Sequence, residues 1–257
     1  MQCLRTVFGG LGGQCPARAA IWNRGSLCPV PADARSPGER PVPAPCGVLA
    51  GPLFVIAFTA IGATRSCYDW RRDPVSSLAI GRQGWLQRGN FVLAGMLYSC
   101  AARELSRCPR RRVGPRAVPV LVAGVGVGLI GSGVFVTDPV SGCRPTTRGE
   151  ARSGAANDGT VSTRESRLHN AFAIPIFAGI PIAALASAAA AIRSRDYRWA
   201  CYSAGSSLAM VGNFALFGAA FGPAPHLGGK GGIFQRLSIV AGFGWLTALS
   251  HRAGRCL

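Results

Sequence analysis

The sequence is poor in charged residues, and its basic residues are almost all arginine. Only 15% of its 257 residues are charged, against about 25% in soluble domains, while 49% are hydrophobic. The formal net charge is +18, and Lys230 is the only lysine among 28 basic residues. Such a charge would suit a nucleic-acid-binding protein. The arginines lie between apolar runs without interleaved aromatic residues, however, so we expect no nucleic-acid partner and interpret them as charges that orient membrane helices.

Closely spaced cysteines and histidines are also lacking. The ten cysteines are scattered, and none forms the CxxC pair that is typical of zinc and redox motifs. There are three histidines, His169, His226 and His251. His169 and His251 are expected at opposite faces of the membrane, which argues against a haem held by paired histidines, and a histidine-rich zinc hydrolase needs more histidines than the outer face offers. We therefore expect no metal and no cofactor. A disulfide between Cys67 and Cys143 is left open, because both lie in loops expected on the same side of a membrane.

What the sequence has instead is a series of long apolar runs. The run 118–136, VPVLVAGVGVGLIGSGVFV, carries no charge and approaches the roughly 20 residues that cross a bilayer core as a helix. Its glycines would destabilise a soluble helix, whereas in lipid the spacing of Gly124 and Gly128 lets helices approach closely. Five other runs have a similar character. The six runs are 46–63, 85–102, 118–136, 168–192, 199–221 and 233–250.

These runs predict an all-α polytopic membrane protein, a bundle of six transmembrane helices in residues 45–252. Residues 1–44 are rich in Pro, Gly and Arg without periodicity, which predicts a disordered tail, and residues 253–257 are expected to form a short C-terminal tail. Pro175 and Pro181 lie inside the fourth run. They predict a kinked helix, because proline removes a backbone donor and neighbouring groups must satisfy the freed carbonyl.

The arginines between the runs predict the orientation. The loop between the second and third runs and the short loop between the fourth and fifth are strongly basic. By the positive-inside rule, these loops and both termini are expected in the cytoplasm, in a multi-pass protein of the cell membrane whose main partner is the lipid bilayer. We interpret Arg110, Arg111 and Arg112 as a topology signal and leave open that they bind anionic lipid head groups.

Under this orientation, the outer end of the bundle collects polar residues from five helices. Polar groups at membrane depth are costly unless they are paired or face a wet cavity, so they are candidate functional residues. Asp138 follows the third run, and Arg236 lies near the start of the sixth; the two could simply form an ion pair. The candidate binding residues are Asp73, Ser76, Asn90, Asp138, His169, Gln235 and Arg236.

Three functions are consistent with this cluster. The first is a small-molecule or proton-linked transporter or sensor with a polar pocket at the outer face. The second is a membrane-embedded enzyme acting on lipid or envelope precursors, with Asp138 and His169 as candidate catalytic residues. The third is a purely structural cluster. Ser132 could act as a nucleophile, although its surroundings are not the GxSG of rhomboid proteases because position 130 is Ile.

Several short motifs resemble one family when they are taken together. They are DPVSSLAIG at 73–81, GWLQ at 84–87 followed by Asn90-Phe91, GSGVFVTDP at 131–139, Leu168-His169, and QRL at 235–237 followed by Trp245. In order and spacing, over about residues 46–252, they resemble the bacterial and archaeal membrane proteins grouped as domain of unknown function 998. The resemblance implies a six-helix integral membrane protein without an established activity. It also implies a role for Pro74, Ser76, Asn90, Asp138, Pro139, His169, Gln235 and Arg236.

Two positions depart from the pattern of that family. Asp73 stands where the family often has histidine, and Asn170 stands where it often has an acidic residue. Both changes remove a group that could take part in acid–base chemistry.

Overall fold

Helices form all the regular structure of the residues that the computed structural model describes, which are 45–66, 68–139, 162–222, 227 and 229–254. The helices are α1 (Pro45–Ala63), α2 (Gly84–Ser106), α3 (Arg110–Val113), α4 (Ala117–Val134), α5 (Arg164–Phe177), α6 (Gly179–Arg193), α7 (Tyr197–Ala220) and α8 (Gly231–Gly254), with a 3₁₀ helix η1 (Val75–Ala79). The all-α prediction is confirmed. The predicted tail 1–44, Cys67 and Cys143 lie outside the described residues.

Four helical segments are long and apolar enough to cross a membrane: α1, α4, the joined α5 and α6, and α8. Large apolar side chains on the helices also point away from the protein interior, for example Ile56 and Val120, which are 65% and 69% exposed. A soluble protein rarely exposes so much apolar surface, whereas lipid tails are as apolar as these side chains. The chain is therefore a multi-pass membrane protein in contact with the bilayer.

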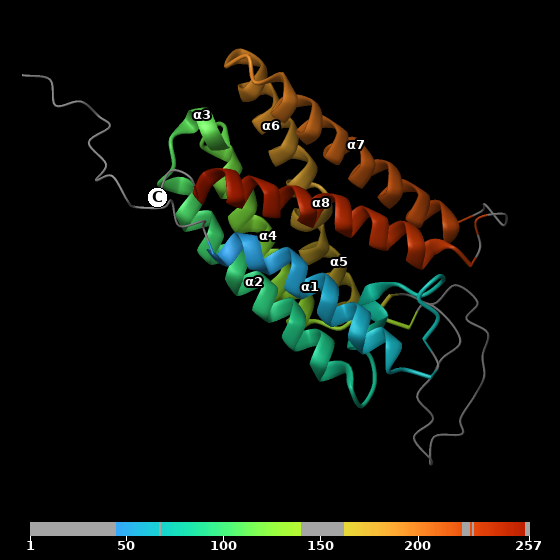
Figure 1. Ribbon diagram of the computed structural model, residues 1–257. Helices are drawn as coiled ribbons and strands as arrows, with labels where there is room; N and C mark the ends of the chain where they lie inside the picture. Colours follow the sequence, from blue (N-terminus) through green and yellow to red (C-terminus); the bar gives the residue numbers. More distant parts are fainter. Residues whose placement is uncertain (1–44, 67, 140–161, 223–226, 228, 255–257) are drawn as a thin grey trace, which may run out of the picture. The chain divides into compact units, whose positions relative to one another are not determined.

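Consecutive helices pack against one another and close into a ring (Figure 1), because α8 returns to pack against α1. Glycines permit the closest approaches. A Cβ atom at Gly95 of α2 would lie 2.6 Å from the carbonyl oxygen of Gly126 in α4, and one at Gly128 would lie 2.6 Å from that of Phe172 in α5. Of the close approaches predicted at Gly124 and Gly128, the one at Gly128 is thus confirmed, with α5 as its partner. At Gly124 the nearest atom to such a Cβ is Cβ of Pro175 at 3.9 Å, an ordinary contact.

The fourth predicted helix is broken where its prolines predict a kink. Helix α5 ends at Phe177 and α6 begins at Gly179. Pro181 has no amide hydrogen to donate to the carbonyl of Phe177, so the hydrogen-bond ladder is interrupted at this turn. Helix α4 ends at Val134, two residues before the end of its apolar run, and Phe135 is extended.

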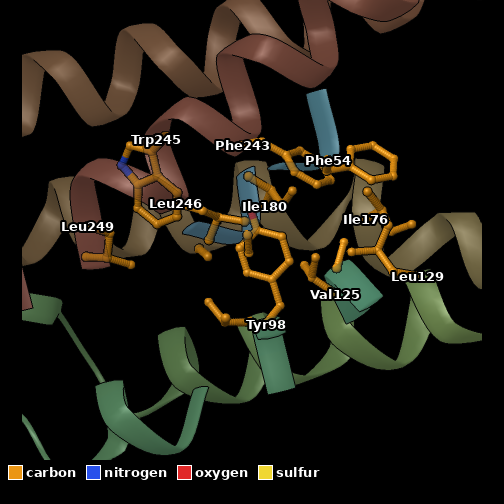
Figure 2. Close-up of a cluster of buried hydrophobic side chains, with 14 of the residues drawn as sticks. Phe54, Tyr98, Val125, Leu129, Ile176, Ile180, Phe243, Trp245, Leu246 and Leu249 are labelled. Carbon is orange, nitrogen blue, oxygen red and sulfur yellow. The ribbon is translucent and has the colours of Figure 1, made fainter. Parts of the chain in front are cut away.

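The centre of the ring is filled by apolar side chains from α1, α2, α4, α6 and α8 (Figure 2). The rings of Phe54 and Phe243 stack with their centroids 5.2 Å apart, and Tyr98 meets Phe243 edge-on. Leu129 and Ile180 are each 1% exposed in the same cluster. This aromatic and aliphatic centre separates two ends of the bundle at which polar groups gather.

Candidate functional site

The predicted site residues occupy segments that meet at one end of the bundle. The long helices run in alternating directions, with α5 and α6 continuing as one (Figure 1). This end therefore contains the loop after α1, the start of α2, the end of α4 and the starts of α5 and α8. We call this the polar end; it is formed by Tyr68, Asp73, Ser76, Gln87, Asn90, Ser132, Asp138, His169, Gln235 and Arg236. Its side chains form several separate hydrogen-bonded groups.

The first group surrounds His169, which is 5% exposed. Its Nδ1 lies 3.1 Å from the carbonyl oxygen of Ser132 and 3.0 Å from that of Phe135. Both partners can only accept, so these contacts assign the hydrogen to Nδ1 and leave Nε2 as an acceptor in the neutral ring. Arg88 donates from Nε to the carbonyl of Gly133 at 3.0 Å. Side chains from two other helices thus satisfy the last carbonyls of α4, which have no partner in their own helix.

Asp138 holds the start of α5. Its carboxylate accepts hydrogen bonds from the amide of Thr163 at 2.9 Å and from the Thr163 hydroxyl at 2.7 Å. The amide of Asp138 donates to the hydroxyl of Ser166 at 3.2 Å, while Thr163 accepts from the Ser166 amide as the N-cap of the helix. The bond from the Thr163 amide lowers the pKa of Asp138 below its usual value. Asp138 is therefore held as an anion.

The third predicted residue, Arg236, binds the loop that follows α1. Its Nη1 donates to the carbonyl oxygens of Trp70 at 2.6 Å and Asp73 at 3.3 Å, and its Nη2 donates to the Tyr68 hydroxyl. Its guanidinium also lies over the Tyr68 ring, 5.5 Å from the centroid. Burial raises the pKa of Tyr68, and the nearby Arg236 charge opposes this shift. Arg236 and Tyr68 together fix the loop against the first turns of α8.

Two amide side chains link this loop and the helices. Gln235 is 6% exposed, and its Oε1 accepts a hydrogen bond from the Val75 amide at 2.7 Å. Asn90 donates from Nδ2 to the carbonyl of Phe54 at 3.1 Å and to Oε1 of Gln87 at 3.4 Å. The spacing of Gln87 and Asn90 places them on one face of α2, and the structure directs that face toward α1.

Three buried polar atoms at this end of the bundle have no hydrogen-bond partner in the described part of the chain. They are Nε of Arg65, in the loop after α1, Nε2 of Gln87 and Oγ of Ser132; Gln87 is fully buried and Ser132 is 2% exposed. Ser132 lies beside His169, because its carbonyl oxygen is 3.1 Å from the imidazole Nδ1, whereas the amide of Gln87 contacts Asn90. Unpaired buried polar groups are rare and indicate strain, water or a ligand.

The structure brings Asp138 and His169 to the same junction of α4 and α5 but gives them separate partners. Arg236 belongs to another group, and among the described side chains Asp138 and Arg236 do not form an ion pair with each other. Ser76 lies half-buried in η1. The Asp73 carboxylate accepts a hydrogen bond from the Asp69 amide at 3.0 Å.

Sequence reasoning did not select Thr163, Ser166 or Tyr68. The pattern Thr163-x-x-Ser166 just before an apolar run is a recognisable N-cap signal, so the first two could have been found. Tyr68 is one aromatic residue in an arginine-rich loop, and its contact with Arg236 joins residues 168 positions apart.

At the opposite end of the bundle lies a basic cavity of about 500 Å³. It is lined by Arg110, Arg111, Ala190, Arg193, Ser194 and Arg195. Arg195 has a φ angle of 59°, in the left-handed region that side-chain-bearing residues rarely adopt. The third arginine of the predicted cluster, Arg112, instead gives its backbone carbonyl to Arg252 Nε at 2.9 Å.

Comparison with known proteins agrees with the helices and motifs described above. The model of a family described as protein of unknown function, DUF998, matches residues 48–252. The chain belongs to the DUF998 family. Its described helices begin at Pro45 and end at Gly254, so the DUF998 match covers nearly all of them. Neither a curated protein nor a solved structure matches this DUF998 chain.

Proposed function

We propose that this DUF998 protein is a small-molecule or proton-linked membrane transporter or sensor whose binding site is the polar end. The observation that supports this is that two buried polar atoms of the polar end lack a hydrogen-bond partner in the described part of the chain: Oγ of Ser132, whose carbonyl contacts His169, and Nε2 of Gln87. A buried donor without a partner costs about 1–3 kcal/mol. A polar solute or a water chain that bonds to these atoms would offset that cost.

The chemistry of His169 extends the argument. With Nδ1 committed to two carbonyl oxygens, Nε2 is the atom available to a solute or a proton. Imidazole can take up and release a proton near neutral pH. Asp138, one helical junction away, supplies a fixed negative charge at the start of α5. Together they form a site suited to a small polar or cationic solute.

Proton flux into liposomes that contain the full-length protein tests this proposal. Under an imposed pH gradient, a trapped pH-sensitive dye should report flux that falls about tenfold in Ser132→Ala and in His169→Asn. His251→Gln is the matched control, because His251 is an exposed residue in the last turn of α8, away from the polar end. A wild-type protein that moves no protons, and whose His169 NMR signals do not respond to pH or to added solutes, would contradict the proposal.

The alternative, an enzyme with Asp138 and His169 as an acid–base pair, draws less support from the geometry. The Asp138 carboxylate is bonded to Thr163, and Nδ1 of His169 is bonded to backbone carbonyls. A lipid profile of a deletion strain tests it: accumulation of one lipid or envelope precursor, reversed by wild type and not by His169→Asn, would favour the enzyme.

We further propose six membrane spans, with both termini in the cytoplasm. Helices α2 and α7 are 23 and 24 residues long, comparable to the 24 residues of α8. Met96 of α2 and Leu208 of α7 are exposed by 53% and 75%, as expected of side chains that face lipid. Reporter domains inserted after Arg107 and within residues 140–161 should be active on the cytoplasmic and outer sides, respectively. A cytoplasmic position for the second insertion would contradict this orientation.

The basic cavity is the proposed site for an anionic lipid head group. Arg110 and Arg111 come from α3, while Arg193 and Arg195 come from the turn between α6 and α7. Four arginines line this one cavity, and guanidinium groups bind phosphate with paired hydrogen bonds. The cavity lies at the end that the positive-inside rule assigns to the cytoplasm, where anionic lipids are concentrated.

A further inference from the structure

A cluster of thiols and a carboxylate lies at the end of the bundle opposite the polar end. Cys46 is in the first turn of α1, and Cys100 and Glu104 are one turn apart on α2. The two Sγ atoms are 2.7 Å apart, and Sγ of Cys100 lies 3.9 Å from Oε1 of Glu104. One potential ligand atom from each of the three residues lies within 4.8 Å of the other two. Residues separated by more than 50 positions thus converge on one point.

A second observation concerns the carboxylate itself. The other oxygen of Glu104, Oε2, is buried and has no hydrogen-bond partner among the described residues. A buried carboxylate oxygen without a donor is costly, and no arginine of this basic chain pairs with it in the described part of the structure. The group that is missing around Glu104 must therefore be a hydrogen-bond donor or a cation.

We propose that Cys46, Cys100 and Glu104 bind a thiophilic divalent cation such as Zn²⁺. Cysteine thiolates and glutamate carboxylates are both zinc ligands, with Zn–S and Zn–O distances of about 2.3 and 2.0–2.2 Å. Three protein ligands leave the fourth tetrahedral position for water or another ligand. Two thiol protons are released when the cation binds, so the net charge of the site stays at −1: it comes from the carboxylate alone before binding, and from two thiolates, the carboxylate and the divalent cation afterwards. The cation would join the start of α1 to the last turns of α2.

A disulfide between Cys46 and Cys100 is the competing interpretation. It would bring the sulfur atoms to about 2.05 Å but would leave Oε2 of Glu104 unpaired. The proposed orientation also places this end in the cytoplasm, where thiols stay reduced. A cation would contact all three side chains, with the two sulfur atoms moving apart from 2.7 Å to the wider spacing that two Zn–S bonds of about 2.3 Å require, whereas the disulfide involves two.

Cobalt binding to the reduced full-length protein in lipid nanodiscs tests the proposal, with Co²⁺ as the probe and Zn²⁺ as its competitor. We expect about one Co²⁺ per chain, with thiolate-to-cobalt absorption that Zn²⁺ abolishes. Cys46→Ser and Cys100→Ser should each weaken binding by at least tenfold and reduce this absorption. Glu104→Gln should weaken binding by about tenfold but keep the absorption. Cys201→Ser, which changes an exposed thiol on α7 outside the cluster, is the matched control and should bind like wild type.

Three results would overturn the inference. They are no Co²⁺ binding by the reduced wild type, Co²⁺ binding by Cys46→Ser and Cys100→Ser that is as tight as that of wild type, or a freshly isolated protein whose Cys46 and Cys100 are joined in a disulfide. If a serine variant does not fold, Glu104→Gln still tests the site, because it should bind Co²⁺ about tenfold more weakly than wild type. The outcome is independent of the proton-flux measurement, because none of these residues belongs to the polar end.

Discussion

Nδ1 of His169 lies 3.1 Å from the carbonyl oxygen of Ser132, so helix α5 supplies a donor that the last turn of α4 lacks. The same nitrogen also reaches Phe135, the first extended residue after α4. His169 therefore has a structural role through Nδ1, while its Nε2 is the atom proposed for function. A substitution that keeps a donor in the place of Nδ1 but removes Nε2 can separate these two roles.

Replacing His169 by Asn and by Ala should have different effects on stability. The Asn amide nitrogen can occupy the place of Nδ1 and donate to the same carbonyls, whereas Ala leaves them buried without a donor. We expect His169→Ala to lower the free energy of unfolding by about 1–3 kcal/mol and His169→Asn to lower it by much less, as measured by denaturant unfolding in detergent. Equal losses in both variants would show that the Nδ1 contacts do not stabilise the end of α4.

The stability of the Asp138 contact should depend on pH. The Thr163 amide lowers the pKa of Asp138 in the folded protein. The contribution of Asp138 to the free energy of unfolding is therefore fully present above its pKa in the unfolded chain, about 3.9. This contribution is lost as the pH falls through the lower pKa of the folded protein. Thermal unfolding midpoints between pH 6 and pH 3 should therefore fall less steeply in Asp138→Asn than in wild type.

Asp196 provides a comparison for this pH series at the other end of the bundle. Its pKa is also lowered, first by the Trp199 amide and then by Arg252, to which it is joined in an ion pair of 2.7 Å. In Asp196→Asn, the thermal unfolding midpoint should also fall less steeply with decreasing pH than in wild type, independently of Asp138. If Asp138→Asn has the same acid slope as wild type while Asp196→Asn does not, the Asp138 contact does not stabilise the fold.

Arg236→Lys should loosen the loop after α1 although it keeps the positive charge. Lysine cannot reproduce the planar group that reaches Trp70, Asp73 and Tyr68 together. We expect amide hydrogen exchange in residues 68–80 to become at least tenfold faster, corresponding to a loss of about 1.4 kcal/mol. Arg72→Lys, at an exposed position of the same loop, should leave the exchange unchanged, and protection retained in Arg236→Lys would contradict the anchoring role.

Arg195→Gly should stabilise the protein and weaken its binding to anionic lipid. Glycine adopts the φ angle of 59° without the steric cost that Arg195 has, so the free energy of unfolding should rise by about 1 kcal/mol. The same change removes one guanidinium from the basic cavity. Flotation with vesicles containing phosphatidylserine should show weaker lipid preference than for wild type, and Arg198→Gly, outside the cavity, should not reproduce that loss.

The helices of this protein can be predicted from local signals in the sequence. These signals are apolar runs of membrane length, the glycine-rich third run (helix α4), and the proline pair Pro175 and Pro181 in the fourth run, and the structure follows each of them. These signals predict helices because a helix forms its backbone hydrogen bonds within its own segment, and because hydrophobic periodicity and proline act over a few residues.

Which polar residues meet could not be predicted from local signals, because it depends on how the helices pack. The sequence predicted that Asp138, His169 and Arg236 reach one end, but not that Arg236 binds Tyr68 and the following loop while His169 caps α4. It likewise gave no sign that Cys46 and Cys100 converge. Such pairings join helices far apart in the chain, and they depend on the rotation of each helix about its axis, which is set by the packing of side chains across the whole bundle.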